Sequence, residues 1–266
     1  MQLSKIQYAS DLHLEFPQNK AFLKANPLVP TGDVLLLAGD IVPFAIMDKH
    51  KDFFSYIADN FQTTYWVPGN HEYYHFDAAT KSGELFEKIR SNVFLVNNTV
   101  VEHQNIDLIF STLWSKISPA NQWQIERGLS DFHVIKYNGF RFSADKYNEL
   151  HNNSIAFITE QLQRHNNEAT TEQQRSNNNK TVVVTHHVPT FLNYPALYRG
   201  SDLSEAFAVE LFNTIEASTI DYWIYGHHHS NTPNFAIGNT QMLTNQLGYV
   251  QRNENQFFSH NKLIQV

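Results

Sequence analysis

The chain has 266 residues, enough for one sizeable domain, and its 20 Phe and 12 Tyr support a large apolar core. It carries 19 Lys and Arg against 26 Asp and Glu, so the formal net charge is −7 and general binding to nucleic acid or anionic membranes is disfavoured. There is no Cys, which excludes disulfides, thiolate metal ligands and a Cys nucleophile. The 14 His residues stand out, because His is a common metal ligand and acid–base group.

The segment from Met1 to Asp11 lacks the apolar stretch of a secretory signal. No apolar run reaches the roughly 18 residues that a membrane-spanning helix needs. We therefore expect a cytoplasmic protein with neither a membrane nor a nucleic-acid partner. The sequence carries no signal for the oligomeric state.

Seven short, continuous apolar runs are rich in β-branched and aromatic residues, which is typical of buried strands. In chain order they are 6–9, 34–38, 64–67, 93–96, 106–111, 181–185 and 221–225. Helices are expected between them at 48–61, 78–91, 146–165 and 204–218. Because strands and helices alternate, the pattern predicts βαβ units and a largely parallel sheet.

The tail of the chain is typical of short strands, which predicts a second, mixed sheet. These strands are expected at 235–237, 240–243, 249–250 and 256–258. The polar, Asn- and Gln-rich stretch at 166–180 has too little apolar surface to pack and is interpreted as an insertion loop. Strands resume directly after this loop, so we expect one domain over residues 1–266.

Side chains that bind metals follow five of the seven runs. They are Asp11 and His13, Asp40, Asn70, His186, and His227 with His229. Parallel α/β sheets place their sites just beyond the carboxyl ends of the strands, so these residues should converge on one edge. Positions i and i+2 of an extended chain point the same way, which lets Asp11 and His13 hold one metal. The carboxylate of Asp40 has two oxygens and can bridge two metals.

The charge balance of such a site favours a phosphate ligand. Two divalent ions against two carboxylates and a bridging hydroxide leave about one net positive charge. Ligands of only oxygen and nitrogen suit Mn, Fe, Zn, Ni or Mg, and the residues do not select among them, although Mn is the favoured expectation.

These motifs, taken in order, resemble those of the calcineurin-like metallophosphoesterase superfamily. The matching set is Asp11-x-His13, Gly39-Asp40, Gly69-Asn70-His71-Glu72, His186 and Gly226-His227-x-His229. Any one motif is weak, but five in the right order over most of the chain are very specific. The resemblance implies an α/β fold, a four-layer αββα sandwich of two mixed β-sheets flanked by helices.

The resemblance also implies a role for each residue. One divalent metal ion would take Asp11, His13, Asp40 and His229, and the other would take Asp40, Asn70, His186 and His227. Asp40 would bridge the two ions. His71 would contact the phosphoryl group or protonate the leaving oxygen, and Glu72 would orient His71.

Several assignments remain open at this point. His187 could replace His186, since neighbours on a strand face opposite ways, but the spacing to Pro189 favours His186. His71 could be a ligand instead of an acid. His228 is larger than the residue usual at its place and is expected at the mouth of the site, where it would affect substrate fit.

Two residues of the loop after the His186 strand are candidates for substrate binding. Tyr198 could stack on a ring and Arg199 could hold a phosphate. The alternative is a packed surface loop without a binding role.

The motif set predicts hydrolysis of phosphate esters by a metal-bridging hydroxide, on a small phosphodiester or phosphomonoester substrate. The fold does not choose between these substrates. One alternative is a catalytically silent scaffold, which the intact ligand set and His71 disfavour. Another is a metal-dependent hydrolase of a different ester or amide, for which the positive site is less well suited.

Overall fold

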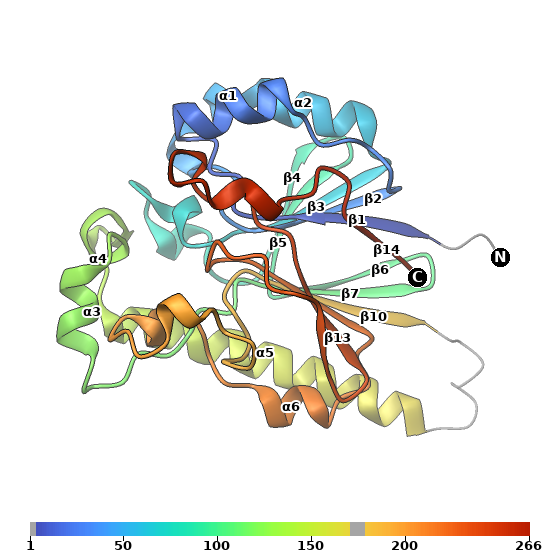
Figure 1. The fold of residues 1–266 in the computed structure, drawn as a ribbon. Coiled ribbons are helices and arrows are strands. Elements are labelled where there is room, and N and C mark those ends of the chain that lie inside the picture. Colours follow the sequence, from blue (N-terminus) through green and yellow to red (C-terminus); the bar gives the residue numbers. More distant parts are fainter. Residues whose placement is uncertain (1–3, 171–178) are drawn as a thin grey trace.

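The computed structural model describes residues 4–170 and 179–266. Two six-stranded sheets lie face to face, and helices cover the outer face of each (Figure 1). This arrangement confirms the four-layer αββα sandwich of two mixed sheets.

The first sheet has the strand order β14-β1-β2-β3-β5-β4. Its parallel centre consists of β1 (Lys5–Ala9), β2 (Val34–Ala38), β3 (Thr63–Val67) and β5 (Val93–Asn97). Antiparallel strands close its two edges, namely β14 (Leu263–Gln265) and β4 (Leu85–Arg90). Helices α1 (Pro17–Ala25) and α2 (Lys51–Asn60) lie over its outer face (Figure 1).

The second sheet has the order β12-β13-β11-β10-β7-β6. Its parallel centre consists of β13 (Thr240–Thr244), β11 (Tyr222–Tyr225), β10 (Lys180–Thr185) and β7 (Ile106–Ser111). The antiparallel edges are β12 (Phe235–Ile237) and β6 (Thr99–His103). The outer helices are α5 (Ala144–Thr170) and α6 (Phe212–Glu216).

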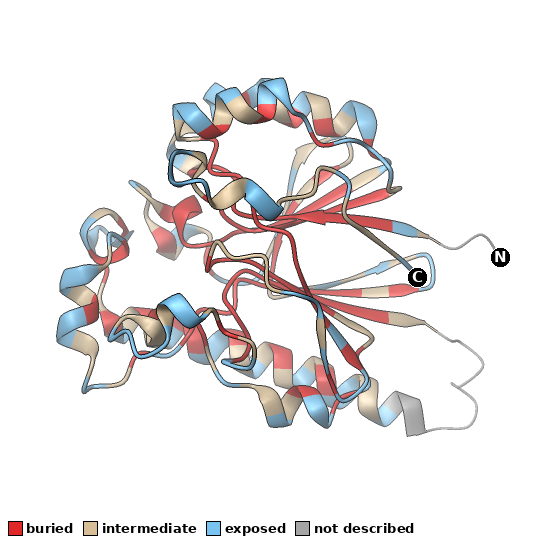
Figure 2. Cartoon of the chain, viewed as in Figure 1, coloured by how far each residue is buried: buried red, intermediate tan, exposed pale blue. Residues whose placement is uncertain are grey.

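The alternation of side chains along the strands divides the core into layers. In β10, Val182 and Val184 pack between the two sheets, against Leu36 of β2. Val183 points the other way and packs against Ile158 of α5. The central strands are therefore apolar on both faces, and Figure 2 shows them as the buried layers of the molecule.

The chain between β7 and α5 forms a mainly helical segment. It contains α3 (Gln122–Gly128), α4 (Asp131–Val134) and the two-stranded ribbon β8 (Lys136–Tyr137) and β9 (Phe140–Arg141). Its apolar residues, including Phe132, form a core of their own with Trp114 and with Tyr147 of α5. This packing brings α4 beside the carboxyl ends of the strands.

Short 3-10 helices complete the chain. They are η1 (Phe44–His50), η2 (His71–Tyr73), η3 (Ala78–Thr80), η4 (Ala196–Tyr198), η5 (Ser204–Ala206), η6 (Val250–Arg252) and η7 (Glu254–Phe257). Two of them stand where the sequence predicted strands at 249–250 and 256–258, so those predictions were wrong. The left-handed residue Asn253, with φ of 59°, separates η6 from η7 and breaks the extended path there.

Two of the four predicted helices also need correction. The stretch 78–91 forms η3 and then β4, because the edge of the sheet is open beside β5 and Leu85 and Ile89 pack against the apolar core there. The stretch 204–218 is not one helix but η5 and α6.

The prediction of a polar loop at 166–180 needs correction at both ends of this range. Helix α5 continues to Thr170, residues 171–178 lie outside the described residues, and β10 begins at Lys180. Asn166 is held by the rest of the protein, since its amide donates to the Ala217 carbonyl and its oxygen accepts from the Thr219 amide. In the part of the chain that the structure describes, no helix is both long and apolar enough to cross a membrane.

Candidate metal centre

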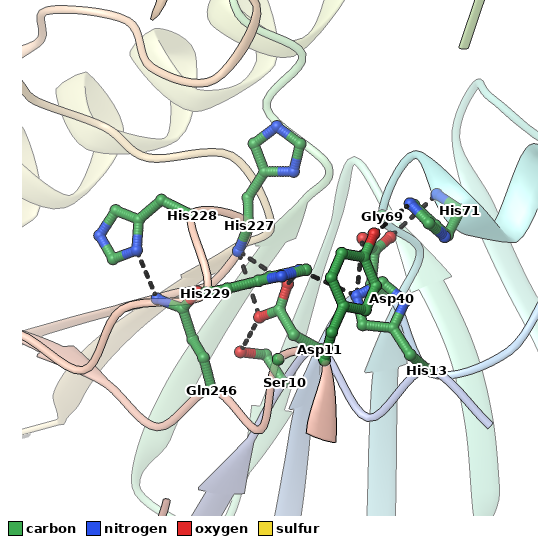
Figure 3. A network of polar contacts seen from close by, with 12 residues as sticks. Ser10, Asp11, His13, Asp40, Gly69, His71, His227, His228, His229 and Gln246 are labelled. Atoms are coloured by element: carbon green, nitrogen blue, oxygen red, sulfur yellow. Dashed lines mark hydrogen bonds and ion pairs between the residues drawn. The ribbon is translucent and has the colours of Figure 1, made fainter. Parts of the chain in front are cut away.

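The predicted ligands meet at the carboxyl ends of five parallel strands. Asp11 and His13 follow β1, Asp40 follows β2, Asn70 follows β3, His186 follows β10, and His227 and His229 follow β11. Both sheets thus contribute to one site, and Figure 3 shows members from each sheet gathered together. Every one of these residues except His229 is buried, and the His229 side chain is 11% exposed.

Five of these residues have left-handed backbone conformations. Their φ angles are 55° for Asp11, 48° for His13, 55° for Asp40, 80° for His227 and 50° for His229. Such a conformation costs a non-glycine residue about 1–3 kcal/mol and persists only where the surroundings enforce it. The chain therefore turns sharply after β1, β2 and β11, and the conformational cost of these turns is concentrated in one site.

The first ligand group consists of Asp11, His13, Asp40 and His229, whose ligand atoms all lie within 4.8 Å of one another. The Nε2 atoms of His13 and His229 are 2.9 Å apart. His229 Nε2 also lies 3.4 Å from Asp11 Oδ1, and His13 Nε2 lies 3.8 Å from Asp40 Oδ2. Two imidazole nitrogens and two carboxylates converge on one point, which suits a divalent cation.

The second ligand group consists of Asp40, His186 and His227, again within 4.8 Å of one another. His186 Nε2 lies 3.0 Å from His227 Nδ1, 3.3 Å from Asp40 Oδ2 and 3.2 Å from Asn70 Oδ1. Asp40 belongs to both groups and directs the same oxygen, Oδ2, toward each. It occupies the bridging position that the motif resemblance implies.

Hydrogen bonds on the far side of the imidazole rings point the ligand nitrogens inward. His186 Nδ1 donates to the Ala38 carbonyl at 2.9 Å, and His229 Nδ1 donates to Glu254 Oε2 at 2.8 Å. These bonds make Nδ1 the outward donor and direct Nε2 of each ring toward the ligand group, where it can bind a metal once its proton is lost. Burial lowers the pKa of His229, but hydrogen bonds to Asp11 and Glu254 outweigh it and raise that pKa to about 10 in the metal-free protein.

Asn70 is oriented in the same way by a residue of the helical segment. Its amide nitrogen donates to Asp131 Oδ1 at 2.9 Å, so its oxygen faces His186. Tyr74 donates to the same Asp131 oxygen at 2.8 Å. Asp131 comes from α4, so this distant segment takes part in building the centre.

The structure places His186, and not His187, in the ligand group. His187 turns away, and its Nε2 atom lies 3.2 Å from the Tyr147 hydroxyl. The ring of His187 packs at 4.1 Å from the ring of His227 and supports it from behind.

Two glycines leave room for the ligands. A Cβ atom on Gly39 or on Gly69 would overlap the His186 ring, and on Gly69 it would also overlap Asp40 Oδ1. Gly39 in addition has a φ of 86°, which L side chains rarely adopt. The nitrogen and oxygen donors converge in two groups, and the glycines let the backbone come close to them. Together these features fit two divalent ions.

His71 lies beside the two ligand groups. Its Nδ1 donates to Glu15 Oε1 at 2.9 Å, and its ring stacks on Tyr74 at 4.0 Å. Its Nε2 lies 3.4 Å from the Tyr249 hydroxyl. Burial lowers the pKa of His71, but the carboxylates of Asp40 and Glu15 outweigh it and raise that pKa.

Glu72 does not orient His71 as the motif resemblance implies. Its two oxygens accept hydrogen bonds from four backbone amides, those of Gly69, Asp40, Ile41 and Val42. Glu72 therefore fixes the loops after β2 and β3. The carboxylate that contacts the His71 ring is that of Glu15, whose Oε1 also accepts from His13 Nδ1 at 3.0 Å.

A cavity of about 340 Å³ opens onto the centre. Of the predicted substrate residues, Tyr198 and His228 line it. The buried His228 ring is turned toward Gln246, and its Nδ1 accepts hydrogen bonds from the Ser230 amide and the Gln246 side chain (Figure 3). These bonds leave the Nε2 of His228 as its donor atom.

Arg199 has a different place from the one predicted. Its side chain is exposed, its Nε–H donates to the Tyr194 carbonyl, and it is not among the described residues that line the cavity. The arginine that lines the cavity is Arg252, whose guanidinium lies 5.0 Å from the centre of the Tyr249 ring.

Four residues of the site were missed in the sequence: Glu15, Asp131, Tyr249 and Glu254. Glu15 stands two residues after His13, a spacing that could have drawn attention to it. The other three lie outside every motif, and only the folded chain brings them to the centre.

A fold of two facing sheets with two ligand groups joined by one carboxylate defines a metal-dependent phosphoesterase. The chain matches the family model of the calcineurin-like phosphoesterases over residues 5–231, and it belongs to that family.

Comparisons with known sequences and solved structures found the following similarities. It is 32% identical to uncharacterized protein L509 of Acanthamoeba polyphaga mimivirus, an alignment that covers 94% of this chain and 93% of the viral protein. Its fold is similar to that of phosphopantetheinyl hydrolase from Mycobacterium tuberculosis, with a TM-score of 0.68 and 16% identity over 98% of this chain and 95% of that one. A dimetal phosphatase from Danio rerio gives a TM-score of 0.47 and 11% identity over 92% of this chain and 88% of that one.

Proposed function

We propose that this chain hydrolyses a small phosphomonoester or phosphodiester with two divalent ions held by the two ligand groups. The observation that carries the proposal is the position of Asp40 Oδ2, which faces both groups beneath a cavity of about 340 Å³. When bound, two such ions supply a nucleophilic hydroxide at neutral pH and polarise the phosphoryl oxygens.

His71 supplies the acid of the proposed reaction. Glu15 accepts from its Nδ1, so its Nε2 is the atom available to the substrate. Nearby carboxylates raise its pKa, which favours a proton on the ring at neutral pH. A protonated His71 can pass this proton from Nε2 to the leaving oxygen as the phosphorus–oxygen bond breaks.

The surroundings of the cavity favour a small phosphorylated substrate. Its walls come from Gly128–Asp131, from residues between Tyr194 and Phe207, and from the tail at Tyr249 to Glu254. Tyr198 offers an aromatic face and His228 a polar atom on these walls. With a net charge of −7, the chain has little of the basic surface that long nucleic acids need.

The test is an assay of metal-stripped protein with bis-p-nitrophenyl phosphate and p-nitrophenyl phosphate, each with and without Mn²⁺. We expect turnover to depend on the metal and to fall in Asp11→Ala and His71→Ala. Faster turnover of the diester would identify a phosphodiesterase, and faster turnover of the monoester a phosphatase. Full activity of either variant, or turnover without metal, would contradict the proposal.

A further inference from the structure

Tyr249 belongs to the tail of the chain, beyond the residues 5–231 that match the family model. Its backbone is fixed at the centre, because its amide donates to Glu254 Oε2 at 2.7 Å, the oxygen that also accepts from His229. The preceding residue, Gly248, donates to the Asp11 carbonyl and accepts from the Asn19 amide. The position of Tyr249 is therefore tied to the metal ligands.

The ring of Tyr249 is enclosed by other rings. It lies 4.4 Å from the ring of His229, 4.8 Å from that of His13 and 5.2 Å from that of Phe16, measured between centroids. The guanidinium of Arg252 lies over it at 5.0 Å. A ring held in this way has little freedom, so its hydroxyl occupies a fixed place.

This ring also lines the cavity that opens onto the centre. Asp11 and His13 are fully buried, whereas Asn70, His71 and His227 line the cavity together with Tyr249. Tyr249 and His71 thus share a wall of the cavity that also carries members of both ligand groups, among them Asp40.

The hydroxyl of Tyr249 and Nε2 of His71 are 3.4 Å apart on that wall. His71 Nδ1 is already bonded to Glu15, whereas Nε2 and the hydroxyl make only this long hydrogen bond to each other, which a substrate can replace. A phosphoryl group lying against both would meet two hydrogen-bond donors at once. At comparable sites, removing one hydrogen-bond donor from the place where charge develops in the transition state lowers kcat by about 10²–10³-fold.

We propose that Tyr249 is a catalytic residue whose neutral hydroxyl donates a hydrogen bond to the phosphoryl group of the substrate, next to His71. The inference rests on the proposed function of the site. It assigns a role in phosphate recognition to the tail of the chain.

The test compares Tyr249→Phe, which removes only the hydroxyl, with the control Tyr137→Phe, whose hydroxyl lies in the β8 ribbon away from the cavity. Three quantities are measured on Mn²⁺-loaded protein: kcat and KM for p-nitrophenyl phosphate, bound Mn²⁺, and the affinity for inorganic phosphate by calorimetry. For Tyr249→Phe we expect a fall in kcat of about 100- to 1,000-fold, weaker phosphate binding and unchanged Mn²⁺, while the control stays at wild-type values.

Wild-type kcat and phosphate affinity in Tyr249→Phe would overturn the inference. Loss of Mn²⁺ in this variant would also overturn it, because the hydroxyl would then serve the metal site and not the substrate. If the wild type hydrolyses no ester, the proposed function fails, and the phosphate affinities of the two proteins still test Tyr249 separately.

Discussion

Glu15 offers a sharp test of how His71 is oriented. One carboxylate oxygen, Oε1, accepts from Nδ1 of His71 at 2.9 Å and from Nδ1 of His13 at 3.0 Å. The change Glu15→Gln keeps the size of the side chain and removes its charge. A hydrogen bond to a charged group contributes about 1.5–3 kcal/mol. Because the amide oxygen can still accept, the bond to His71 is weakened and not lost, which should slow the step in which His71 acts by up to about 100-fold.

The assay compares two monoesters, p-nitrophenyl phosphate and phenyl phosphate. Phenolate is the poorer leaving group and needs the proton from His71 more than p-nitrophenolate does. We therefore expect Glu15→Gln to reduce kcat/KM by about 100-fold with phenyl phosphate and by about 10-fold or less with p-nitrophenyl phosphate. The assays use saturating Mn²⁺, because the same change weakens the bond that orients His13; at saturation bound Mn²⁺ should equal the wild-type amount.

Glu160→Gln, an exposed substitution on α5, is the matched control and should leave both rates unchanged. If Glu15→Gln lowered kcat/KM equally for the two esters and also lost Mn²⁺, Glu15 would act through His13. Wild-type rates in Glu15→Gln would refute the reasoning altogether.

Three further predictions concern the metal ligands. In Gly69→Ala the new Cβ overlaps the ligand atoms of the second group, so elemental analysis should find fewer bound ions per chain than in the wild type. Asp131→Asn should weaken Mn²⁺ binding by about 10- to 100-fold in calorimetry, because the amide of Asn70 loses the carboxylate that orients it. Although burial lowers their pKa values, neighbouring carboxylates raise the pKa of His186 to about 9 and that of His229 to about 10 in the metal-free protein. Both rings are then protonated at neutral pH, so loading should release about two protons and metal affinity should fall as the pH is lowered. An indicator-dye measurement that finds no proton release would contradict this last prediction.

The convergence of the candidate metal ligands was predictable because each depends on local sequence and on one rule of topology. Asp11 and His13 come directly after a buried strand, as do Asp40 and His186 after theirs. Parallel strands bring their carboxyl ends together whatever the lengths of the connections. The expected groups could therefore be assembled without knowledge of the helices.

The residues that orient these ligands could not be found in the same way. Asp131 reaches Asn70 only because the core around Phe132 and Trp114 holds α4 beside the strand ends. Tyr249 reaches His71 only through the path of the tail after β13. Contacts of this kind depend on tertiary packing, and neither residue lies in a motif.

The errors in the predicted secondary structure also arise from tertiary contacts that the local sequence does not show. The apolar spacing of 78–91 is compatible with a helix, but pairing with β5 makes the second half of this stretch an edge strand. Tertiary pairing overrides local preference most easily in such short amphipathic stretches.

The central claim is that Asp40 joins two metal ions into one catalytic centre. The most direct test titrates metal-free wild-type protein and Asp40→Asn with Mn²⁺, and follows bound metal together with turnover of a p-nitrophenyl ester. We expect two bound ions in the wild type, with turnover appearing as the second ion binds, and weaker binding with little turnover in Asp40→Asn. A wild-type protein that binds one ion or none, or an Asp40→Asn variant that matches the wild type in both respects, would contradict it.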